Sequence, residues 1–490
     1  MDDRPDFPDN NGFQWRSGWS CQSDKISRPT VEFPLSFAAD KALTIAQDIS
    51  RDGRIPNSRH VQVQGDVVFR RSESGKPSSS ITLEVIVSDG RIEVATHWEA
   101  DRQVLFITIP GNVPWDETPE GPCVNVLATV WVPEGGVLDS VEVKTVQLGI
   151  NLFDNLSLEV AKDTKLASTV GKIVSASTGV DSRDDQIFDF GAPDSFRFRS
   201  RIIEVKTTAA SIKGSWPLLD YLGFVSTSGS IRACIEPKEV DKDKPTPATL
   251  YVKSFSGDVE LREPIQAAQD AFTVGQAWKQ ARPETELDLR AETVLPPRDY
   301  RVDVHTTSGN IKGALAFSTG ANFKSTSGNM RLELLPVLDA SYAGTDTKTS
   351  ALQTASTSGN TGVFVLEPLW VDSVQGSYIP FPAPMVPIPG LETSETGSSA
   401  AAALLRSLNS QHTLTSGDLS LHYPSAWEGE LSLATNSGRL TAVGDGVEII
   451  KSGKGFPGFN KYILARKGKE GGGRLLAKTT SGDVLVTVGN

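Results

Sequence analysis

The chain has 490 residues, of which 38% are hydrophobic and 22% charged, so it can bury a sizeable core. Its 43 glycines and 29 prolines, against 3 methionines, indicate many turns and few long helices. The net charge of −12 argues against a nucleic-acid partner or a general anionic-membrane role, because both need clustered lysine and arginine. No apolar run of about eighteen residues occurs, so we expect no transmembrane segment in this chain.

The first 160 residues divide into two parts. Residues 1–58 lack hydrophobic periodicity and are rich in Asp, Pro, Asn and Ser, which predicts a partly disordered N-terminal arm. Within this arm, VEFPLSF at 31–37 is the segment that could dock as a strand. Residues 59–160 contain alternating runs such as VQVQGDVVF and VNVLATVWVP. These runs predict a strand-rich lead-in that is continuous with the repeats after it.

From residue 161 to 490 the chain repeats one short polar word. Its clearest copies are TSGN at 307–310 and at 326–329, which are 19 residues apart. A degenerate copy, TTAASIKG at 207–214, lies in step with the later ones. Ser-Gly recurs with similar flanks at Ser228-Gly229, Ser256-Gly257, Ser308-Gly309, Ser327-Gly328, Ser358-Gly359, Ser416-Gly417, Ser437-Gly438 and Ser481-Gly482.

Apolar residues alternate with polar ones on both sides of each Ser-Gly. This period of two predicts a strand on each side, with the glycine at a tight corner. A unit of about twenty residues favours a parallel β-solenoid over an antiparallel sandwich, because identical corners can stack on one another. The expected neighbours in the stack are Thr306 with Ser325, Asn310 with Asn329, and Ile311 with Met330.

Two insertions, at 263–298 and 366–412, interrupt the repeats. Residues 263–284 form the best helix candidate, with an apolar stripe of Ile265, Ala268, Phe272 and Trp278. The second insertion contains YIPFPAPMVPIPG, which must be extended, and SSAAAALLRSL, which is a short helix candidate. We expect both insertions to emerge on one side of the fold, where repeat proteins often bind their ligands.

Little in the sequence indicates catalysis. No nucleophile elbow, zinc-protease motif or P-loop is present. His305 and His422 flank corners and are predicted to face solvent. The corner acids Asp258, Asp418 and Asp483 are distant in sequence, so we expect each to bond local backbone rather than to converge on a substrate.

Several other features have a plain structural interpretation beside a functional one. The acidic loop with Asp181, Asp184, Asp185, Asp189 and Asp194 lacks a calcium-loop spacing, which favours a solvated loop. GKGFPG at 453–458 matches a dinucleotide pattern by letters, but a hairpin loop suits its flanks better. Residues 451–478 carry eight basic residues against Glu470. A hairpin that guards a sheet edge is favoured, and contact with an anionic surface or glycan is the alternative.

The chain has three cysteines and several aromatic residues in or near predicted loops. Cys21, Cys123 and Cys234 have no metal-binding spacing, and at most one disulfide could form. Buried or unpaired thiols are the favoured interpretation. Exposed aromatics could stack on sugars, but burial beneath the insertions is favoured. The aromatics concerned are Trp216, Trp370, Tyr378 and Phe381.

The repeated word T-[TS]-S-G-[DN]-[IV], set among short β-runs, resembles the putative-adhesin family of β-solenoid domains, and most of all its fungal branch. The resemblance covers roughly residues 140–490. It implies a right-handed, parallel, β-helix-like fold, an adhesin-like function with no assigned ligand, and no catalytic motif. Fungal members often carry an N-terminal transmembrane segment. A membrane-tethered or cell-surface location would follow if such a segment preceded this chain.

We therefore predict an all-β parallel β-solenoid that acts as a non-enzymatic, adhesin-like scaffold, with a glycan or a protein at a surface as its partner. One alternative is a carbohydrate-active enzyme of the polysaccharide lyase or glycosidase type, which would need clustered carboxylates in a groove. The other is an intracellular structural protein. No catalytic, metal-binding or cofactor-binding residue is assigned, no cofactor is expected, and the ligand-binding residues and compartment stay open.

Overall fold

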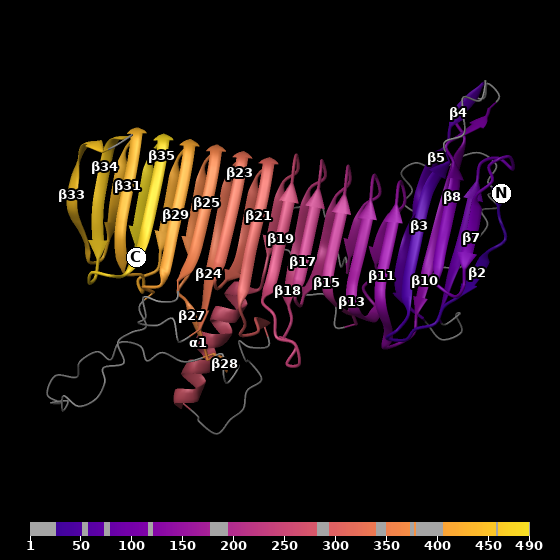
Figure 1. Ribbon diagram of the computed structural model, residues 1–490, viewed down its shortest axis with the longest axis horizontal. Coiled ribbons are helices and arrows are strands. Elements are labelled where there is room, and N and C mark those ends of the chain that lie inside the picture. Colours follow the sequence, from indigo (N-terminus) through magenta and orange to yellow (C-terminus); the bar gives the residue numbers. More distant parts are fainter. Residues whose placement is uncertain are drawn as a thin grey trace, which may run out of the picture.

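The computed structural model describes residues 26–50, 57–72, 79–115, 121–176, 195–281, 294–339, 349–372, 377–378, 405–456 and 459–489. The regular structure of these residues is almost entirely β-strand, with one helix, α1 (Ile265–Ala281). The expectation of an all-β chain is confirmed. Most strands belong to two large sheets that run side by side along one long axis (Figure 1).

The front sheet faces the viewer in Figure 1 and contains sixteen strands. In spatial order they are β33 (Val447–Phe456), β34 (Phe459–Lys467), β31 (Gly429–Ser437), β35 (Gly473–Ser481), β29 (Leu408–Ser416), β25 (Ser350–Ser358), β23 (Gly320–Ser327), β21 (Tyr300–Ser308), β19 (Ala248–Ser254), β17 (Tyr221–Ser226), β15 (Arg197–Thr207), β13 (Ser157–Ser168), β11 (Gly136–Thr145), β3 (Ala42–Ser50), β8 (Val104–Pro110) and β7 (Ala95–Glu99).

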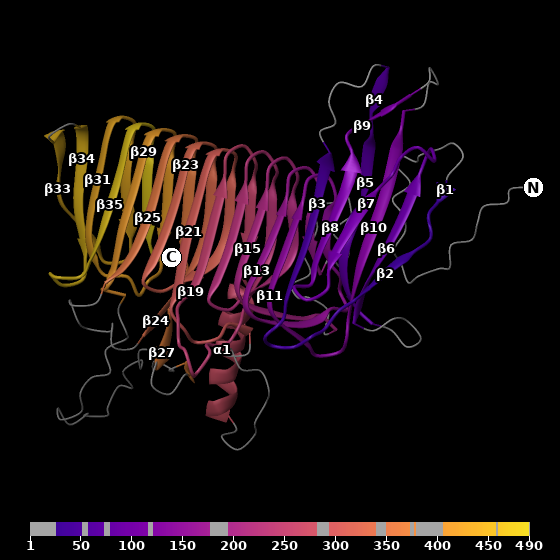
Figure 2. The same ribbon diagram turned by 45° about the vertical axis from the view of Figure 1, so that its right-hand side comes forward.

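The back sheet lies behind it. Its strands, in chain order, are β1 (Ile26–Ser27), β2 (Val31–Pro34), β5 (Gln62–Arg71), β6 (Ser80–Val87), β10 (Cys123–Val132), β12 (Gly149–Leu152), β14 (Ile173–Ser175), β16 (Ile212–Leu218), β18 (Ile231–Pro237), β20 (Val259–Arg262), β22 (Ile311–Phe317), β24 (Met330–Asp339), β26 (Thr361–Val365), β30 (Leu419–Tyr423), β32 (Leu440–Gly444) and β36 (Val484–Val488). Strand β24 also pairs with β27 (Leu369–Asp372), and β27 pairs with β28 (Ser377–Tyr378). A short pair, β4 (Ser58–His60) and β9 (Asn112–Pro114), projects at the N-terminal end (Figure 2).

From β11 to β26, and again from β29 to β32, the chain alternates between the two sheets. We use the word rung for one front strand, the Ser-Gly corner after it and the back strand that follows. Front strand β21 pairs in parallel with β23, and back strand β22 pairs in parallel with β24. These pairings confirm the three predicted contacts. Thr306 lies beside Ser325, Ile311 lies beside Met330, and the N–H of Asn329 donates to Oδ1 of Asn310.

The corner glycine is required because neighbouring rungs approach closely there. Gly328 has a φ of +147°, and a Cβ added to it would stand 2.1 Å from the carbonyl oxygen of Gly309. The Gly309 N–H donates to the Ser327 carbonyl at 3.0 Å. Backbone therefore stacks directly on backbone, which leaves no space for a side chain.

The residue after each corner glycine forms a second ladder. Each Asn or Asp side chain accepts a hydrogen bond from the backbone N–H of the next rung, at 2.7–3.0 Å. In spatial order the ladder runs Asp258, Asn310, Asn329, Asn360, Asp418, Asp483 and Arg439. Arg439 ends it, because a guanidinium has no acceptor.

The rungs do not follow chain order at the C-terminal end. β35 pairs in parallel with both β29 and β31, and β36 pairs with both β30 and β32. The last rung of the chain therefore lies between the two rungs that precede it. β34 then pairs antiparallel with β31, and β33 forms the outer edge of the front sheet.

The N-terminal arm differs in part from expectation. β2 confirms that the first four residues of the 31–37 segment dock as a strand, against β6. β3 was not anticipated, and it pairs in parallel with β8 and β11. Leu43 and Ile45 of β3 are completely buried. Residues 26–50 thus belong to the folded body, because the short alternation in ALTIAQDIS supplies an apolar face.

The core fills the space between the sheets with the inward side chain of every second residue. Val304, Ile311 and Leu315 of one rung are all buried, and the same pattern continues through successive rungs. Most of the outward positions of both sheets are polar, although a few exposed apolar side chains, such as Phe364 and Leu485, also lie there. These outward positions, and the insertions, are where ligands can reach the molecule.

Candidate ligand-binding groove

The two insertions meet on the same side of the molecule. Figure 1 shows α1, β27 and β28 together below the stack. Nε2 of Gln269 in α1 donates to the carbonyl of Glu367 at 2.9 Å. The rings of Phe272 and Tyr378 meet edge to face with centroids 6.2 Å apart. The expectation that the insertions emerge on one side is confirmed for the described residues.

Helix α1 forms close to the predicted position. Ile265 and Ala268 are buried against the sheet, and Phe272 is half-buried, as the apolar stripe predicted. Side chains from residue 274 onward, including Trp278, lie outside the described part. The helix begins three residues after β20 and lies below the stack, where a hollow separates it from the ends of β26 and β30 (Figure 1).

That hollow is a groove of about 510 Å³, lined by α1, by β26 and the segment after it, and by the end of β30. Its floor holds two parallel rings. Phe364 and His422 stack with centroids 4.4 Å apart and an angle of 2° between the ring planes. The sheet register causes this contact, because Phe364 of β26 lies directly beside His422 of β30. Phe364 stays 43% exposed.

The walls of the groove carry polar groups in fixed positions. The Glu367 carboxylate accepts the Ser425 N–H at 2.9 Å and the Ser425 hydroxyl at 2.7 Å. On α1, Nε2 of Gln266 donates to Asp270 at 3.3 Å. Exposed ring atoms together with oriented amides and carboxylates suit a ligand that has both C–H surfaces and hydroxyls.

A buried carboxyl lies at the root of the first insertion. Glu263 is 1% exposed, and its Oε2 accepts the backbone N–H of Ala316 at 2.6 Å. Burial raises the pKa of Glu263 to about 8, so the group is mostly protonated at neutral pH. It follows that Glu263 anchors the start of the insertion and does not supply charge to the groove.

Three of the five histidines take different positions in the fold. Nε2 of His305 lies 2.7 Å from Oδ1 of Asp303 on the outer face of the front sheet. His422 lies in the groove described above. His412 is fully buried, with ring nitrogens 2.8 Å from the Thr354 hydroxyl and 2.9 Å from the Tyr423 hydroxyl. Burial lowers the pKa of His412 to about 3, so it is neutral.

The prediction for the corner acids is wrong in two respects. Asp418 and Asp483 lie on adjacent rungs, because the last rung inserts beside β29–β30. Asp258 remains apart, next to Asn310. All three carboxylates accept backbone N–H groups of the next rung, 44 to 65 residues away in the chain, and not of their own turn. Their role is structural, but the bonds are not the local ones that were expected.

The β33–β34 hairpin, which carries the first part of the basic segment, forms the end of the front sheet, whereas Arg474 and Lys478 lie on the inserted strand β35. GKGFPG lies in the β33–β34 hairpin, as predicted, although its Pro457 and Gly458 lie outside the described residues. Nζ of Lys461 donates to the Gly438 carbonyl at 2.6 Å, and Nζ of Lys467 donates to the Ser425 carbonyl at 2.7 Å. These lysines satisfy acceptors at the end of the stack. The interpretation as an edge guard accounts for them.

The aromatic predictions are confirmed where the structure describes the residues, but the cysteine prediction is wrong. Trp216, Trp370 and Tyr378 are buried, as favoured, and Phe381 lies outside the described residues. Cys234 is free and buried. Cys123 is disulfide-bonded, so the interpretation of three unpaired thiols is wrong. The acidic loop with Asp181 to Asp194 lies outside the described residues.

A second hollow, of about 730 Å³, lies at the start of β13 and β15, beside the loop after β18. Four basic and four acidic side chains line it, and Lys238 pairs with Glu236 at 3.0 Å. Opposite charges in equal number give it no clear preference for a charged ligand. We therefore place the candidate site in the groove beside α1.

The described part of the chain shows neither a metal-binding cluster nor a membrane-spanning helix. No three of its His, Cys, Asp or Glu side chains gather as a metal site requires. None of its helices has both the length and the apolar character to cross a membrane.

The sequence interpretation missed Phe364 as a site residue and did not connect it with His422. A signal for both is present. Phe364 follows Gly359 by five residues, and His422 follows Gly417 by five. Equal offsets from stacked glycines put the two rings in one row, provided that their rungs are neighbours.

Comparison with known proteins gives only distant likenesses. No family model matches the chain, and no curated protein matches it. A "putative cell adhesion protein" from Clostridium sporogenes aligns over 47% of this chain and 100% of its own, at 9% identity and a TM-score of 0.22. A "putative adhesin" from Bacteroides fragilis aligns over 71% and 100%, at 9% identity and 0.24. One from Parabacteroides merdae aligns over 70% and 96%, at 11% and 0.16. Scores this low establish no common fold.

Proposed function

We propose that the protein is a non-enzymatic, adhesin-like β-solenoid scaffold that binds a carbohydrate in the groove beside α1. The solenoid assignment is supported by rungs that repeat one corner and pair in parallel in both sheets. Residues 161–490 form the solenoid in this proposal. The lead-in at 59–160 is continuous with it, since β12 pairs with both β5 and β14.

The observation that carries the binding proposal is the exposed Phe364–His422 stack. Soluble proteins usually bury large aromatic rings, yet 43% of Phe364 faces the groove side of the sheet. A sugar presents C–H groups that pack against rings and hydroxyls that bond amides and carboxylates. Gln266, Gln269 and Glu367 offer such groups around the stack.

The carboxylates at the groove support binding more than catalysis. Glycoside hydrolysis needs two carboxyl groups that face one glycosidic bond. Asp270 bonds Gln266 across one helical turn, and Glu367 is held by Ser425. Each carboxylate is thus engaged by a neighbour, as in a site that orients hydroxyl groups.

A glycan array tests the proposal. The fluorescently labelled chain should bind a defined group of glycans, and Phe364→Ala should lower that signal about tenfold or more. Leu485→Ala is the matched control. Leu485 is 41% exposed on the same outer face but does not line the groove. Equal binding by Phe364→Ala and the unmodified chain, or no binding by either, would refute the proposal.

A further inference from the structure

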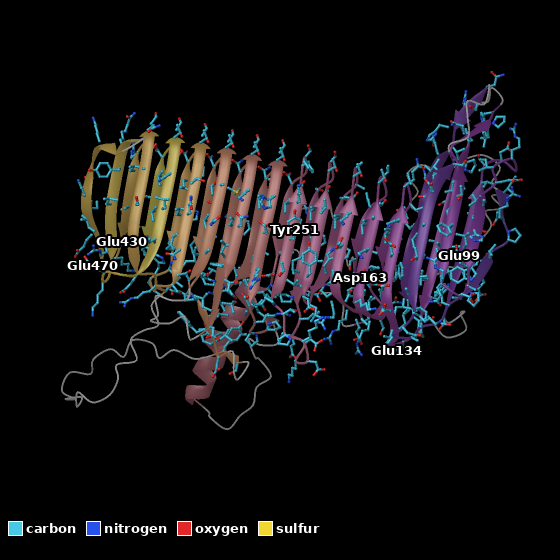
Figure 3. All side chains as sticks on the ribbon, in the orientation of Figure 1. Glu99, Glu134, Asp163, Tyr251, Glu430 and Glu470 are labelled. Carbon is cyan, nitrogen blue, oxygen red and sulfur yellow. The ribbon has the colours of Figure 1, made fainter. Side chains whose placement is uncertain are left out.

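A row of side chains crosses the outer face of the front sheet at right angles to the strands. Adjacent members are register partners on seven successive rungs. In order they are Glu204, Gly223, Tyr251, Asp303, Asn322, Gln353 and Gln411. Neighbouring strands are about 4.8 Å apart, so the row spans about 29 Å. Figure 3 shows Tyr251 on this face.

Tyr221 covers the glycine of the row. A Cβ added to Gly223 would stand 2.8 Å from both Cε1 and Oη of Tyr221. The phenol ring therefore lies across Gly223 instead of standing away from the sheet. Tyr251 is the next member of the row, so the two tyrosines form an aromatic platform. Ile202, beside Tyr221 and 39% exposed, extends its apolar surface.

Beyond the platform the row consists of hydrogen-bonding groups. Asp303 accepts Nδ2 of Asn322 at 2.7 Å and lies 2.7 Å from Nε2 of His305, so its carboxylate is held in place. Gln353 and Gln411 are exposed on the next two rungs. At the other end, Lys206 lies 2.6 Å from Glu204. Glu204 therefore has a partner of opposite charge, and the Asp303 carboxylate is held by Asn322 and His305, so both acids of the row are engaged by neighbours.

We propose that this row binds a neutral, linear polysaccharide that lies along the stack, with sugar rings on Tyr221 and Tyr251 and hydroxyls bonded to Asp303, Asn322, Gln353 and Gln411. The ligand is linear because the row is straight and open over seven rungs. It is neutral because the row offers amide groups and both of its carboxylates are already bonded to neighbours. The aromatic platform favours pyranose rings, whose C–H faces pack on aromatic faces. The site lies on the opposite sheet from the groove and does not depend on it.

Titration calorimetry with cellohexaose and laminarihexaose, and pull-down on insoluble cellulose and chitin, test this site. The reference chain carries Phe364→Ala so that the groove contributes nothing. It should bind at least one of these glycans, and adding Tyr251→Ala should weaken that binding about tenfold. Gly223→Ala keeps both tyrosines but displaces the Tyr221 ring, and it should also weaken binding. Tyr462→Ala, which removes a tyrosine from the end hairpin of the same sheet, should bind like the reference.

A second variant distinguishes loss of binding from loss of folding. Gln353 and Gln411 are exposed, so changing both to alanine should leave the melting temperature unchanged and still weaken binding about threefold or more. If no glycan binds the reference chain, the proposal is overturned. It is also overturned if Tyr251→Ala and the double glutamine variant both bind like the reference.

Discussion

The backbone N–H of Asp483 donates to Oδ1 of Asp418 at 2.9 Å, although the two residues are 65 positions apart. This bond places the last rung beside β29–β30, and the rung formed by β31 and β32 lies on its other side. β35 and β36 are thus an internal part of the stack. Their stability should be that of the core.

Hydrogen–deuterium exchange tests this placement. Amides of β35 bond to strands on both sides, so we expect residues 475–481 to exchange as slowly as residues 410–416 of β29. The edge strand β33 has a neighbour on only one side and is the internal control for fast exchange. Fast exchange throughout β35 would contradict the inserted position.

Replacing Gly328 with valine should destabilise the fold. The strained φ alone costs about 1–3 kcal/mol, and the added Cβ also meets the Gly309 carbonyl. Gly320→Val is the matched control, because a Cβ there meets nothing within 4 Å. Chemical denaturation of both variants measures the difference. Equal stability would show that the corner has room for a side chain.

His412 should make the fold sensitive to acid. Its folded-state pKa is about 3 and its ordinary pKa is 6.5. Between these values the unfolded chain binds a proton that the folded chain excludes, so the free energy of unfolding falls as the pH falls from 6.5 towards 3. The slope from this group is at most about 1.4 kcal/mol per pH unit.

The variant His412→Gln should flatten that slope, because glutamine has no proton to gain. His97→Gln is the control, since the His97 side chain is 70% exposed. Urea denaturation at several pH values between 4 and 7 measures both. An unchanged slope in His412→Gln would show that His412 is not the acid-sensitive group.

Titration of Glu263 should change the stability in the opposite direction, lowering it as the pH rises. Its folded-state pKa of about 8 exceeds the ordinary value of 4.5, so the unfolded chain loses a proton first as the pH rises. Stability from this group is therefore complete below pH 4.5 and is lost progressively up to about pH 8. Glu263→Gln keeps an acceptor for the Ala316 N–H and removes this loss.

We expect Glu263→Gln to gain stability over the unmodified chain as the pH rises from 5 to 8. Glu430→Gln, at a side chain that is 53% exposed, should show no such trend. Thermal melting across this pH range compares the two. A constant difference between Glu263→Gln and the parent would mean that the carboxyl is ionised throughout.

The number of reactive thiols tests the assignment of the cysteines. A disulfide at Cys123 uses two of the three thiols, and Cys234 is free but buried. We expect one thiol per chain to react with Ellman's reagent in denaturant, and three after reduction. In the folded state the single thiol should react slowly, because burial raises the pKa of Cys234 to about 11. Three reactive thiols without reduction would exclude the disulfide.

Much of the fold could be predicted because its signal is local and repeated. The alternation around Ser308-Gly309 and Ser327-Gly328 defines the strands, the corner and the register that joins Asn310 to Asn329. The order of rungs could not be predicted in the same way. Corners as alike as those at Ser437 and Ser481 can neighbour any other corner, so only tertiary packing decides that Ser481 lies next to Ser416.

The candidate sites also could not be predicted without the order of the rungs. Phe364 and His422 become neighbours only when β26 and β30 pair across the second insertion. Gly223 suggests a gap on the sheet, but only the structure shows that Tyr221 fills it. In contrast, burial of Trp216 and Trp370 was favoured correctly, because large aromatics near a core seldom remain exposed.

The inserted last rung has a consequence for synthesis of the chain. At about 5–20 residues per second, a ribosome needs about 3–13 s to advance the 65 residues from Ser416 to Ser481. During that time one edge of β29 is unpaired, or β29 pairs directly with β31 and that pairing must separate later to admit β35. An exposed strand edge is a site of aggregation. The growing chain therefore passes through a vulnerable interval, which ends when its last rung enters the stack.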